Sequence, residues 1–284
     1  MNKHLLAALF FFLPLAALKA SEPRPLELPK IQVVPIQDSS TGREYELLIK
    51  LPEDYAKSGA KKHPVIYYTD AIWAVEILSA TVEYTIQDAI LVGIGWQKNR
   101  VDWQKNLAGA EKEWWSRFRD LRPALDKDNH ENKGEAHKFL AFLNNDVIKY
   151  VEGSYRANQD NRTYFGYSLG GAFGVFRLLN QPDIFQNYII GSPSGLASYM
   201  GSLSEAGSQK TISGLPKQTN VFISYGALEH KLGDNVEKFV GQLRNRKPAN
   251  LSLQSVVIES ADHNTAFPKT SVRSIDWLAG RLQP

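Results

Sequence analysis

One serine in the sequence stands in a setting typical of a catalytic nucleophile. Gly166-Tyr167-Ser168-Leu169-Gly170 matches the pattern G-x-S-x-G, in which a tight turn between a strand and a helix exposes the serine hydroxyl. Side chains at positions 166 and 170 would collide with the neighbouring strand and helix, so glycine suits both. The pattern predicts Ser168 as a nucleophile, and the alternative is a glycine-rich packing turn with a spectator serine.

A serine nucleophile needs a base, and His263 is the best-placed histidine. It follows the last predicted strand, and in this type of site the chain order is serine, acid, histidine. A loop at the carboxyl end of that strand can reach back over Ser168. Four other histidines are less well placed. His63 precedes a strand and His130 lies in a charged segment. His137 begins a helix, and His230 occupies the position expected for the acid.

The acid of such a site is expected after the preceding strand, where the stretch ALEHKLGDN offers Glu229 and Asp234. Glu229 is nearer the strand end and is favoured, although it could instead be a solvent-facing acid in a loop. The acid would hold the imidazole in one tautomer and stabilise the imidazolium. Asp262 neighbours His263, but adjacent side chains in a turn usually diverge, so Asp262 is a weaker candidate.

Acyl transfer also needs two backbone N–H donors for the oxyanion that forms. One donor is expected from Leu169, the residue after the nucleophile. The other is expected from the loop that follows the strand VIYYT, at Ile72, with Ala71 and Trp73 as alternatives.

The elements that must position these residues alternate along the chain. Eight β-rich runs predict strands at Ile31–Ile36, Tyr45–Leu51, Val65–Thr69, Ile90–Ile94, Thr163–Phe165, Tyr188–Ile190, Val221–Tyr225 and Leu251–Ile258. Runs from Val65 onward are mostly continuous and apolar, as in parallel strands buried on both faces, whereas the first two suggest an antiparallel edge. Apolar residues at helical spacing predict helices at 136–151, 175–179, 236–243 and 272–282. This alternation predicts an α/β fold with a mostly parallel sheet flanked by helices.

The N-terminus has the features of a signal peptide. Lys3 precedes an apolar run, Leu5–Leu18, and small residues follow, so we expect cleavage after Ala20. Residues 21–284 would then form a single domain in a periplasmic or secreted protein. An uncleaved anchor is the alternative, but the run is short for a membrane span and contains Pro14.

Composition narrows the class of protein further. The chain of 284 residues has no cysteine, which excludes disulfides and thiolate metal sites and fits export to a bacterial periplasm. Its formal net charge of +3 gives no argument for nucleic-acid binding. No later stretch is apolar enough to cross a membrane, and the predicted chemistry needs no metal or cofactor.

A long segment at about 96–135 interrupts the alternation of strands and helices. Long irregular connections are usually functional or mobile, so this one is a candidate insertion or lid-like loop. Its tryptophans could line a pocket or could anchor the loop to the core: Trp96, Trp103, Trp114 and Trp115.

Together these motifs resemble the esterase family of α/β-hydrolases that includes esterase D and the trilactone siderophore esterases. The resemblance covers most of the chain after the leader. It rests on the stretches LPEDYAKSGAKKHPVIYYTD, LVGIG, RFRDLRP, GEAHKFLAFLNNDVIKYVEGSY, GYSLGG, GSPS and DHN, in that order.

The resemblance implies an α/β-hydrolase fold and hydrolysis of carboxylic esters, with Ser168 as nucleophile and His263 as base. It also implies that Arg117 and Asp120 order the rim near the substrate, although a structural ion pair is an equal alternative. Arg117 is therefore a candidate for substrate binding, and Trp96 of the tryptophan-containing segment is another. The expected partner is a small-molecule ester, of which a catecholate siderophore is one candidate. An acyltransferase or peptidase using the same residues, and a binding protein without activity, are the rival functions.

Overall fold

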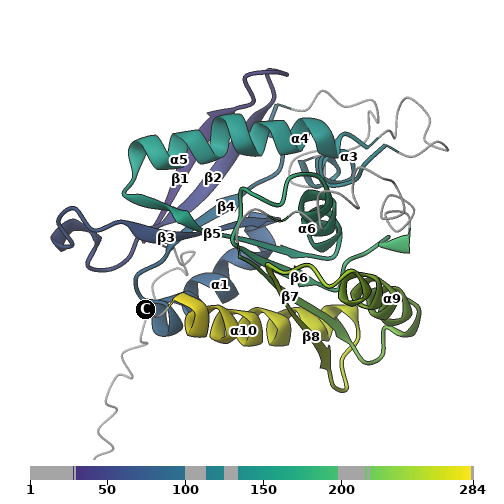
Figure 1. The fold of residues 1–284 in the computed structure, drawn as a ribbon. Coiled ribbons are helices and arrows are strands. Elements are labelled where there is room, and N and C mark those ends of the chain that lie inside the picture. Colours follow the sequence, from purple (N-terminus) through teal and green to yellow (C-terminus); the bar gives the residue numbers. More distant parts are fainter. Residues whose placement is uncertain are drawn as a thin grey trace, which may run out of the picture.

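The computed structural model describes residues 28, 30–99, 113–124, 134–197, 215 and 218–282. At its centre lies one eight-stranded sheet with the strand order β1-β2-β4-β3-β5-β6-β7-β8 (Figure 1). The strands are β1 (Ile31–Gln37), β2 (Glu44–Lys50), β3 (His63–Thr69), β4 (Ile90–Ile94), β5 (Ala157–Tyr167), β6 (Asn187–Gly191), β7 (Thr219–Gly226) and β8 (Leu251–Ile258).

The sheet is parallel except at one edge. Strand β2 pairs antiparallel with both β1 and β4, and every later neighbour pair is parallel. All eight predicted strands are confirmed, as is the antiparallel edge. Strand β5 begins at Ala157, six residues before the predicted Thr163, because residues 158–162 are polar and carry no apolar signal.

Helices cover both faces of the sheet (Figure 1). One face carries α1 (Ala71–Thr85) and α10 (His263–Leu282), which pack against each other. The other carries α4 (Ala136–Phe142), the π-helical turn η2 (Leu143–Ile148), α5 (Lys149–Ser154), α6 (Leu169–Asn180) and α9 (His230–Arg246). Two short helices, η1 (Tyr55–Lys57) and α3 (Ser116–Asp120), lie in the connections. This three-layer arrangement is that of an α/β-hydrolase.

Each face of the sheet has its own apolar core. Alternate strand residues such as Tyr67 and Ile190 pack under α4, α6 and α9, and their neighbours such as Ile66 and Ile189 pack under α1 and α10. These four side chains are fully buried. Alternation across a doubly covered sheet explains why the central strands are continuous apolar runs.

Helix α1 begins where a loop was predicted. The segment from Asp70 to Trp73 was expected to be a loop after β3, but the chain becomes helical at Ala71. Only Asp70 is left outside, with φ +55° in the left-handed region. The predicted helix at 136–151 is confirmed, with a π-helical turn in its middle.

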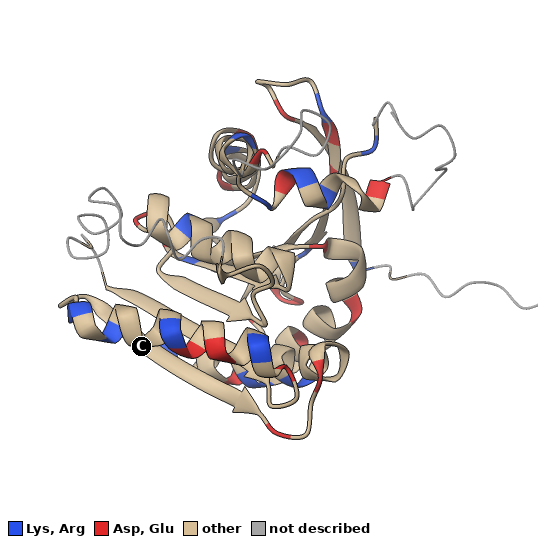
Figure 2. Ribbon diagram, turned by 90° about the vertical axis from the view of Figure 1, so that its right-hand side faces the viewer, with Lys and Arg blue, Asp and Glu red and all other residues tan. Residues whose placement is uncertain are grey.

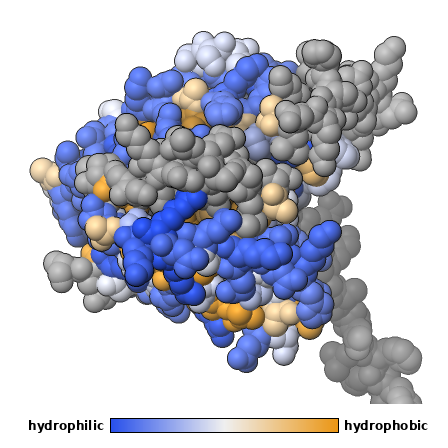
Figure 3. Space-filling view, turned by 45° about the vertical axis from the view of Figure 1, so that its right-hand side comes forward, coloured by the Kyte–Doolittle hydropathy of each residue, from blue (hydrophilic) through white to orange (hydrophobic). Residues whose placement is uncertain are grey.

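The surface carries both signs of charge, interspersed along the helices (Figure 2). In the view of Figure 3 the described surface is mostly hydrophilic, with small scattered apolar areas. Exposed Ile72 and Trp73 lie in the first turn of α1. Among the described residues no helix has both the length and the apolar character needed to cross a bilayer. The predicted signal peptide, Trp103 and His130 lie outside the described residues.

Candidate active site

The turn at Ser168 has the geometry that its sequence predicts. Strand β5 ends at Tyr167 and α6 begins at Leu169, so Ser168 alone makes the corner, with φ +57°. Such a backbone costs about 1–2 kcal/mol for a residue with a side chain. An added Cβ on Gly166 would overlap the Gly170 carbonyl oxygen, which confirms the steric reason for glycine there.

The structure brings Ser168, His263 and Glu229 into one chain of hydrogen bonds. The Oγ of Ser168 lies 2.9 Å from His263 Nε2, and His263 Nδ1 lies 2.5 Å from Glu229 Oε1. The three residues follow the carboxyl ends of β5, β8 and β7, which lie at the same edge of the parallel part of the sheet, with β6 between β5 and β7. Asp234, the other predicted acid, lies on α9, and no hydrogen bond joins it to His263 within the described chain. This arrangement can move a proton from the hydroxyl to the imidazole.

Glu229 is held as a carboxylate by its donors. Burial raises the pKa of this carboxyl, but hydrogen bonds from His263, from Ser192 and from the N–H of Gly226 outweigh that effect, so its pKa lies below the ordinary value. The donor distances to Oε2 are 2.6 Å for the Ser192 hydroxyl and 2.7 Å for Gly226 N. An ionised Glu229 can only accept, so it fixes the proton of His263 on Nδ1.

Two helix N-termini supply the candidate oxyanion donors. Leu169 is the first residue of α6, and Ala71 and Ile72 are the first two of α1, so their N–H groups have no intrahelical acceptor. The N–H of Trp73 donates to the Asp70 carbonyl at 3.0 Å, which removes Trp73 from the alternatives. Donation by Leu169 and Ile72 to an oxyanion stays a prediction.

Arg117 pairs with Asp70 rather than with Asp120. Its Nε and Nη2 donate to the two carboxylate oxygens of Asp70 at 2.7 and 2.8 Å, and the indole N–H of Trp96 donates to Asp70 Oδ1 at 2.9 Å. Asp120 instead accepts from Arg119 and from Tyr45. The buried pair of Asp70 and Arg117 therefore fixes the residue that precedes α1.

A cavity of about 380 Å³ lies above the serine. Its walls include Thr69, Asp70, Trp73, Ala74, Arg117, Phe165, Tyr167, Ser168, His263, Asn264 and Phe267. Arg117 thus borders the space where a substrate would lie. Trp96, also predicted to bind substrate, is 8% exposed and packs edge-on to Trp73 at 4.9 Å, behind the cavity wall. Substrate contact by either residue stays a prediction.

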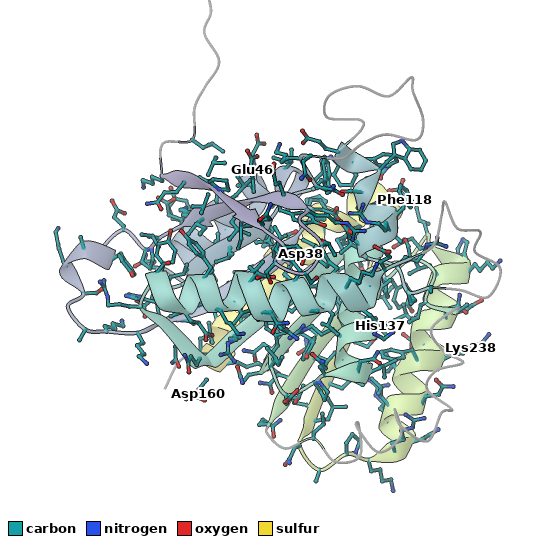
Figure 4. The ribbon with its side chains drawn as sticks, turned by 90° about the horizontal axis from the view of Figure 1, so that it is seen from above. Asp38, Glu46, Phe118, His137, Asp160 and Lys238 are labelled. Carbon is teal, nitrogen blue, oxygen red and sulfur yellow. The ribbon has the colours of Figure 1, made fainter. Side chains whose placement is uncertain are left out.

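The other described tryptophans of the long connection pack among themselves. Trp114 and Trp115 lie 4.9 Å apart, and both contact Phe118 of α3, which is labelled in Figure 4. Trp114 also lies 6.2 Å from Trp73. In the described part of the connection these rings therefore anchor α3 beside the cavity.

A second set of the same residue types lies at the opposite edge of the sheet. His63 Nε2 lies 3.0 Å from Ser58 Oγ, and His63 Nδ1 lies 2.7 Å from Asp88 Oδ1. The Ser58 hydroxyl donates to the Tyr55 carbonyl and accepts from Arg156, and the imidazole is 1% exposed. The Ser58 hydroxyl gives its proton to a backbone carbonyl, and the imidazole of His63 is buried. Both observations indicate a structural role, in which these side chains join η1 to β3. His63 was expected to precede a strand, and in the structure it is the first residue of β3.

His137 and His230 lie away from the serine. His137 is on α4 (Figure 4), where its ring packs on Phe176 at 4.7 Å. His230 is the first residue of α9 and is exposed. Among the described residues there is also no group of three or more His, Cys, Asp or Glu side chains that could hold a metal ion.

Two serines near the site were not predicted from the sequence. Ser192 and Ser194 lie in the segment Gly191–Gly195, and they contact Glu229 and Ser168 respectively. The motif GSPS marked the resemblance, but no role was assigned to it. The motif GSPS directly follows a strand that neighbours the nucleophile strand, and this position could have indicated Ser192 and Ser194 from the sequence.

Comparison with known proteins identifies the family of the chain. The family model described as "Putative esterase" matches residues 39–255. The chain belongs to this esterase family. Membership of this family gives ester hydrolysis as the class of reaction.

The ferri-bacillibactin esterase BesA of Bacillus subtilis is 31% identical over 184 residues, which cover 59% of this chain and 59% of BesA. This esterase thus matches less than two thirds of BesA's length. The solved siderophore hydrolase EstA from Aspergillus nidulans has a TM-score of 0.74 at 17% identity, covering 93% of this chain and 99% of EstA. An IroE-like serine hydrolase from Shewanella oneidensis has a TM-score of 0.73 at 19% identity, covering 89% of this chain and 81% of that protein. The two solved structures share the fold of this esterase.

Proposed function

We propose that the protein is an exported serine esterase that hydrolyses small carboxylic esters through an acyl-enzyme. The observation that carries this proposal is the position of the His263 imidazole, 2.9 Å from the Ser168 hydroxyl and 2.5 Å from the Glu229 carboxylate. Membership of the esterase family supports the reaction class, and the open cavity beside Ser168 gives a substrate access.

The reaction starts with proton transfer from Ser168 Oγ to His263 Nε2 as Oγ attacks the ester carbonyl carbon. The carbonyl oxygen gains a negative charge and accepts hydrogen bonds from Leu169 N–H and Ile72 N–H. The tetrahedral intermediate collapses, and the alcohol leaves with the proton from Nε2. Water then attacks the acyl-enzyme through the same base, and the acid is released with Ser168 restored.

The substrate class we propose is the trilactone of a catecholate siderophore. The relative BesA is named a ferri-bacillibactin esterase, and it is 31% identical to this chain over 184 residues. The cavity itself is walled by aromatic rings, namely Trp73, Phe165, Tyr167 and Phe267, which suit a planar aromatic group.

The test uses a fluorophosphonate probe and a short p-nitrophenyl ester with the wild type, Ser168→Ala and Ser58→Ala. We expect Ser168→Ala to lose labelling and at least about 10⁴-fold in kcat. Ser58→Ala removes the hydroxyl of the set formed by Ser58, His63 and Asp88 and should retain both properties. A wild type that neither labels nor hydrolyses would favour a binding protein, and hydrolysis of amides in preference to esters would favour a peptidase.

Export is the remaining part of the proposal. It is supported by the sequence of the first twenty residues and by the absence of cysteine from the chain. We expect the full chain expressed in a bacterium to yield a periplasmic or secreted protein whose N-terminus is Ser21. N-terminal sequencing of that fraction checks this, and an intact Met1 in the membrane fraction would contradict it.

A further inference from the structure

A second hydroxyl lies beside the predicted nucleophile. The Oγ of Ser194 is 3.0 Å from the Oγ of Ser168. The N–H of Ser194 donates to the Ser168 carbonyl at 3.1 Å, and the N–H of Ser168 donates to the Gly191 carbonyl at 3.0 Å. The end of β6 and the residues that follow it are therefore bonded to both backbone groups of Ser168, which fixes where the Ser194 side chain begins.

The direction of the bond between the two hydroxyls follows from the other hydrogen bonds of the site. Glu229 is a carboxylate that accepts from His263 Nδ1, so in the neutral ring the free lone pair is on Nε2. The single proton of the Ser168 hydroxyl is then directed to Nε2, 2.9 Å away. The proton between the serines must consequently come from Ser194.

We propose that Ser194 is a further catalytic residue, whose hydroxyl donates a hydrogen bond to the Ser168 oxygen as that oxygen loses its proton. This inference rests on the proposed serine mechanism. A hydrogen bond to an oxygen that gains negative charge is stronger than one to a neutral hydroxyl, so the contact favours the transition state over the ground state. The same donor acts again when the acyl-enzyme breaks down, because Ser168 Oγ then leaves the carbonyl carbon with the bonding electron pair and recovers its proton from His263.

Ser192 in the same segment has a different partner. Its hydroxyl donates to Glu229 Oε2 at 2.6 Å, at the far end of the hydrogen-bonded chain. The segment Gly191–Gly195 therefore provides one hydroxyl for the acid and one for the nucleophile. Only the second touches a reacting atom, which is why Ser194 rather than Ser192 is assigned a catalytic role.

The experiment compares wild type with Ser194→Ala, Ser194→Cys and Ser194→Thr, using a p-nitrophenyl ester and a fluorophosphonate probe. Loss of a charge-assisted bond predicts a fall of roughly 10- to 100-fold in kcat for Ser194→Ala, with KM changed less than about threefold. The second-order rate of probe labelling should fall by a similar factor, since it requires the same attack. The threonine variant keeps a hydroxyl and should recover most of the rate, and the cysteine variant, with a weaker donor, should be intermediate.

A matched control separates this role from a structural one. Ser274→Ala deletes a buried hydroxyl of α10, which donates to the Ser271 carbonyl, and should leave kcat unchanged. The backbone bonds of Ser194 survive its replacement by alanine, so the melting temperature should change no more than in the control. If Ser194→Ala does not fold, the cysteine variant carries the comparison.

The inference is overturned if the Ser194 variants match an active wild type, or if kcat falls while probe labelling does not. An inactive, unlabelled wild type would instead refute the proposed function itself. The two failures are thus distinguishable, because the first leaves Ser168 and His263 active and the second does not.

Discussion

The carboxylate of Glu229 fixes the tautomer on which the base depends. It accepts the Nδ1 proton of His263 and is itself held by Ser192 and Gly226. The side chain of Glu229 is 6% exposed, so water cannot easily replace any of these bonds. A neutral amide at this position would be able to donate to Nδ1 and would favour the wrong tautomer.

We therefore expect Glu229→Gln to lower kcat by about 10³- to 10⁴-fold with little effect on KM. The matched variant Asp234→Asn changes the other predicted acid, on α9, and should stay within about twofold of wild type. Steady-state hydrolysis of a p-nitrophenyl ester measures both. A larger loss in Asp234→Asn than in Glu229→Gln would transfer the acid role to Asp234.

At the scale of the helices, α1 and α6 meet the cavity with their N-termini, and tight contacts hold both in place. Asp70 precedes α1 in a left-handed conformation, and its carboxylate is pinned by Arg117 and Trp96. The start of α6 packs so closely on β3 that a Cβ on Gly170 would overlap Thr69 Oγ1. The first N–H groups of the two helices are positioned by these contacts.

Breaking the pair beneath α1 should affect both stability and catalysis. Asp70→Asn leaves the buried guanidinium of Arg117 without its counter-charge, which we expect to lower the free energy of unfolding by about 3–5 kcal/mol. The double variant Asp70→Asn with Arg117→Met should regain much of that loss. Urea unfolding checks both, and Asp54→Asn, at the exposed pair with Lys57, is the control, with a change within about 0.5 kcal/mol.

A displaced α1 should also lower kcat in Asp70→Asn. If the free energy of unfolding of Asp70→Asn fell by less than about 1 kcal/mol, the ion pair would not be what holds the start of α1 in place.

Replacing glycine by alanine should have opposite effects on stability at the corner before Ser168 and inside a helix. A Cβ at Gly166 would overlap the Gly170 carbonyl, so Gly166→Ala should cost about 1–3 kcal/mol or more and reduce activity. Gly241 lies inside α9 with no atom near the place of a Cβ, so Gly241→Ala should add about 0.5–1 kcal/mol with unchanged kcat. Thermal or urea unfolding measures both changes. Equal effects of the two replacements would contradict the steric account of the corner.

For the molecule as a whole, the sequence predicted the sheet well because doubly covered parallel strands are continuous apolar runs. It also predicted which residues meet, because the segments after β5, β7 and β8 must share one edge of a parallel sheet. It did not predict partners that depend on how loops pack. The bidentate pair of Arg117 and Asp70 joins residues 47 positions apart, and nothing in RFRDLRP indicates that Arg117 rather than Arg119 faces Asp70. The beginning of α1 was predicted to be a loop, but a helix N-terminus also leaves its first N–H groups without intrahelical acceptors, so it can supply the same donors.

The antiparallel edge is tied to the rest of the molecule by a charged cluster at the surface. Glu83 near the end of α1 accepts from Lys30 before β1 at 2.8 Å and from Lys50 at the end of β2 at 2.5 Å. Hydrogen bonds from Lys30 and then Lys50 lower the pKa of Glu83 to about 2, from an ordinary value of 4.5. A carboxyl whose pKa is lowered by folding stabilises the folded state above its unfolded-state pKa, and that stabilisation is lost as the pH falls towards the folded-state value.

The difference in melting temperature between wild type and Glu83→Gln should therefore be largest near neutral pH. It should shrink as the pH falls from 4.5 towards 2, where protonated Glu83 resembles the amide. Because the cluster is partly exposed to solvent, high salt should also reduce the difference at neutral pH. Calorimetric scans of both proteins across this pH range measure the difference in melting temperature. Glu259→Gln, which changes a solvent-exposed carboxyl, is the control. A difference that did not change between pH 7 and acid would mean that Glu83 acts through packing, and that charge does not hold the antiparallel edge to α1.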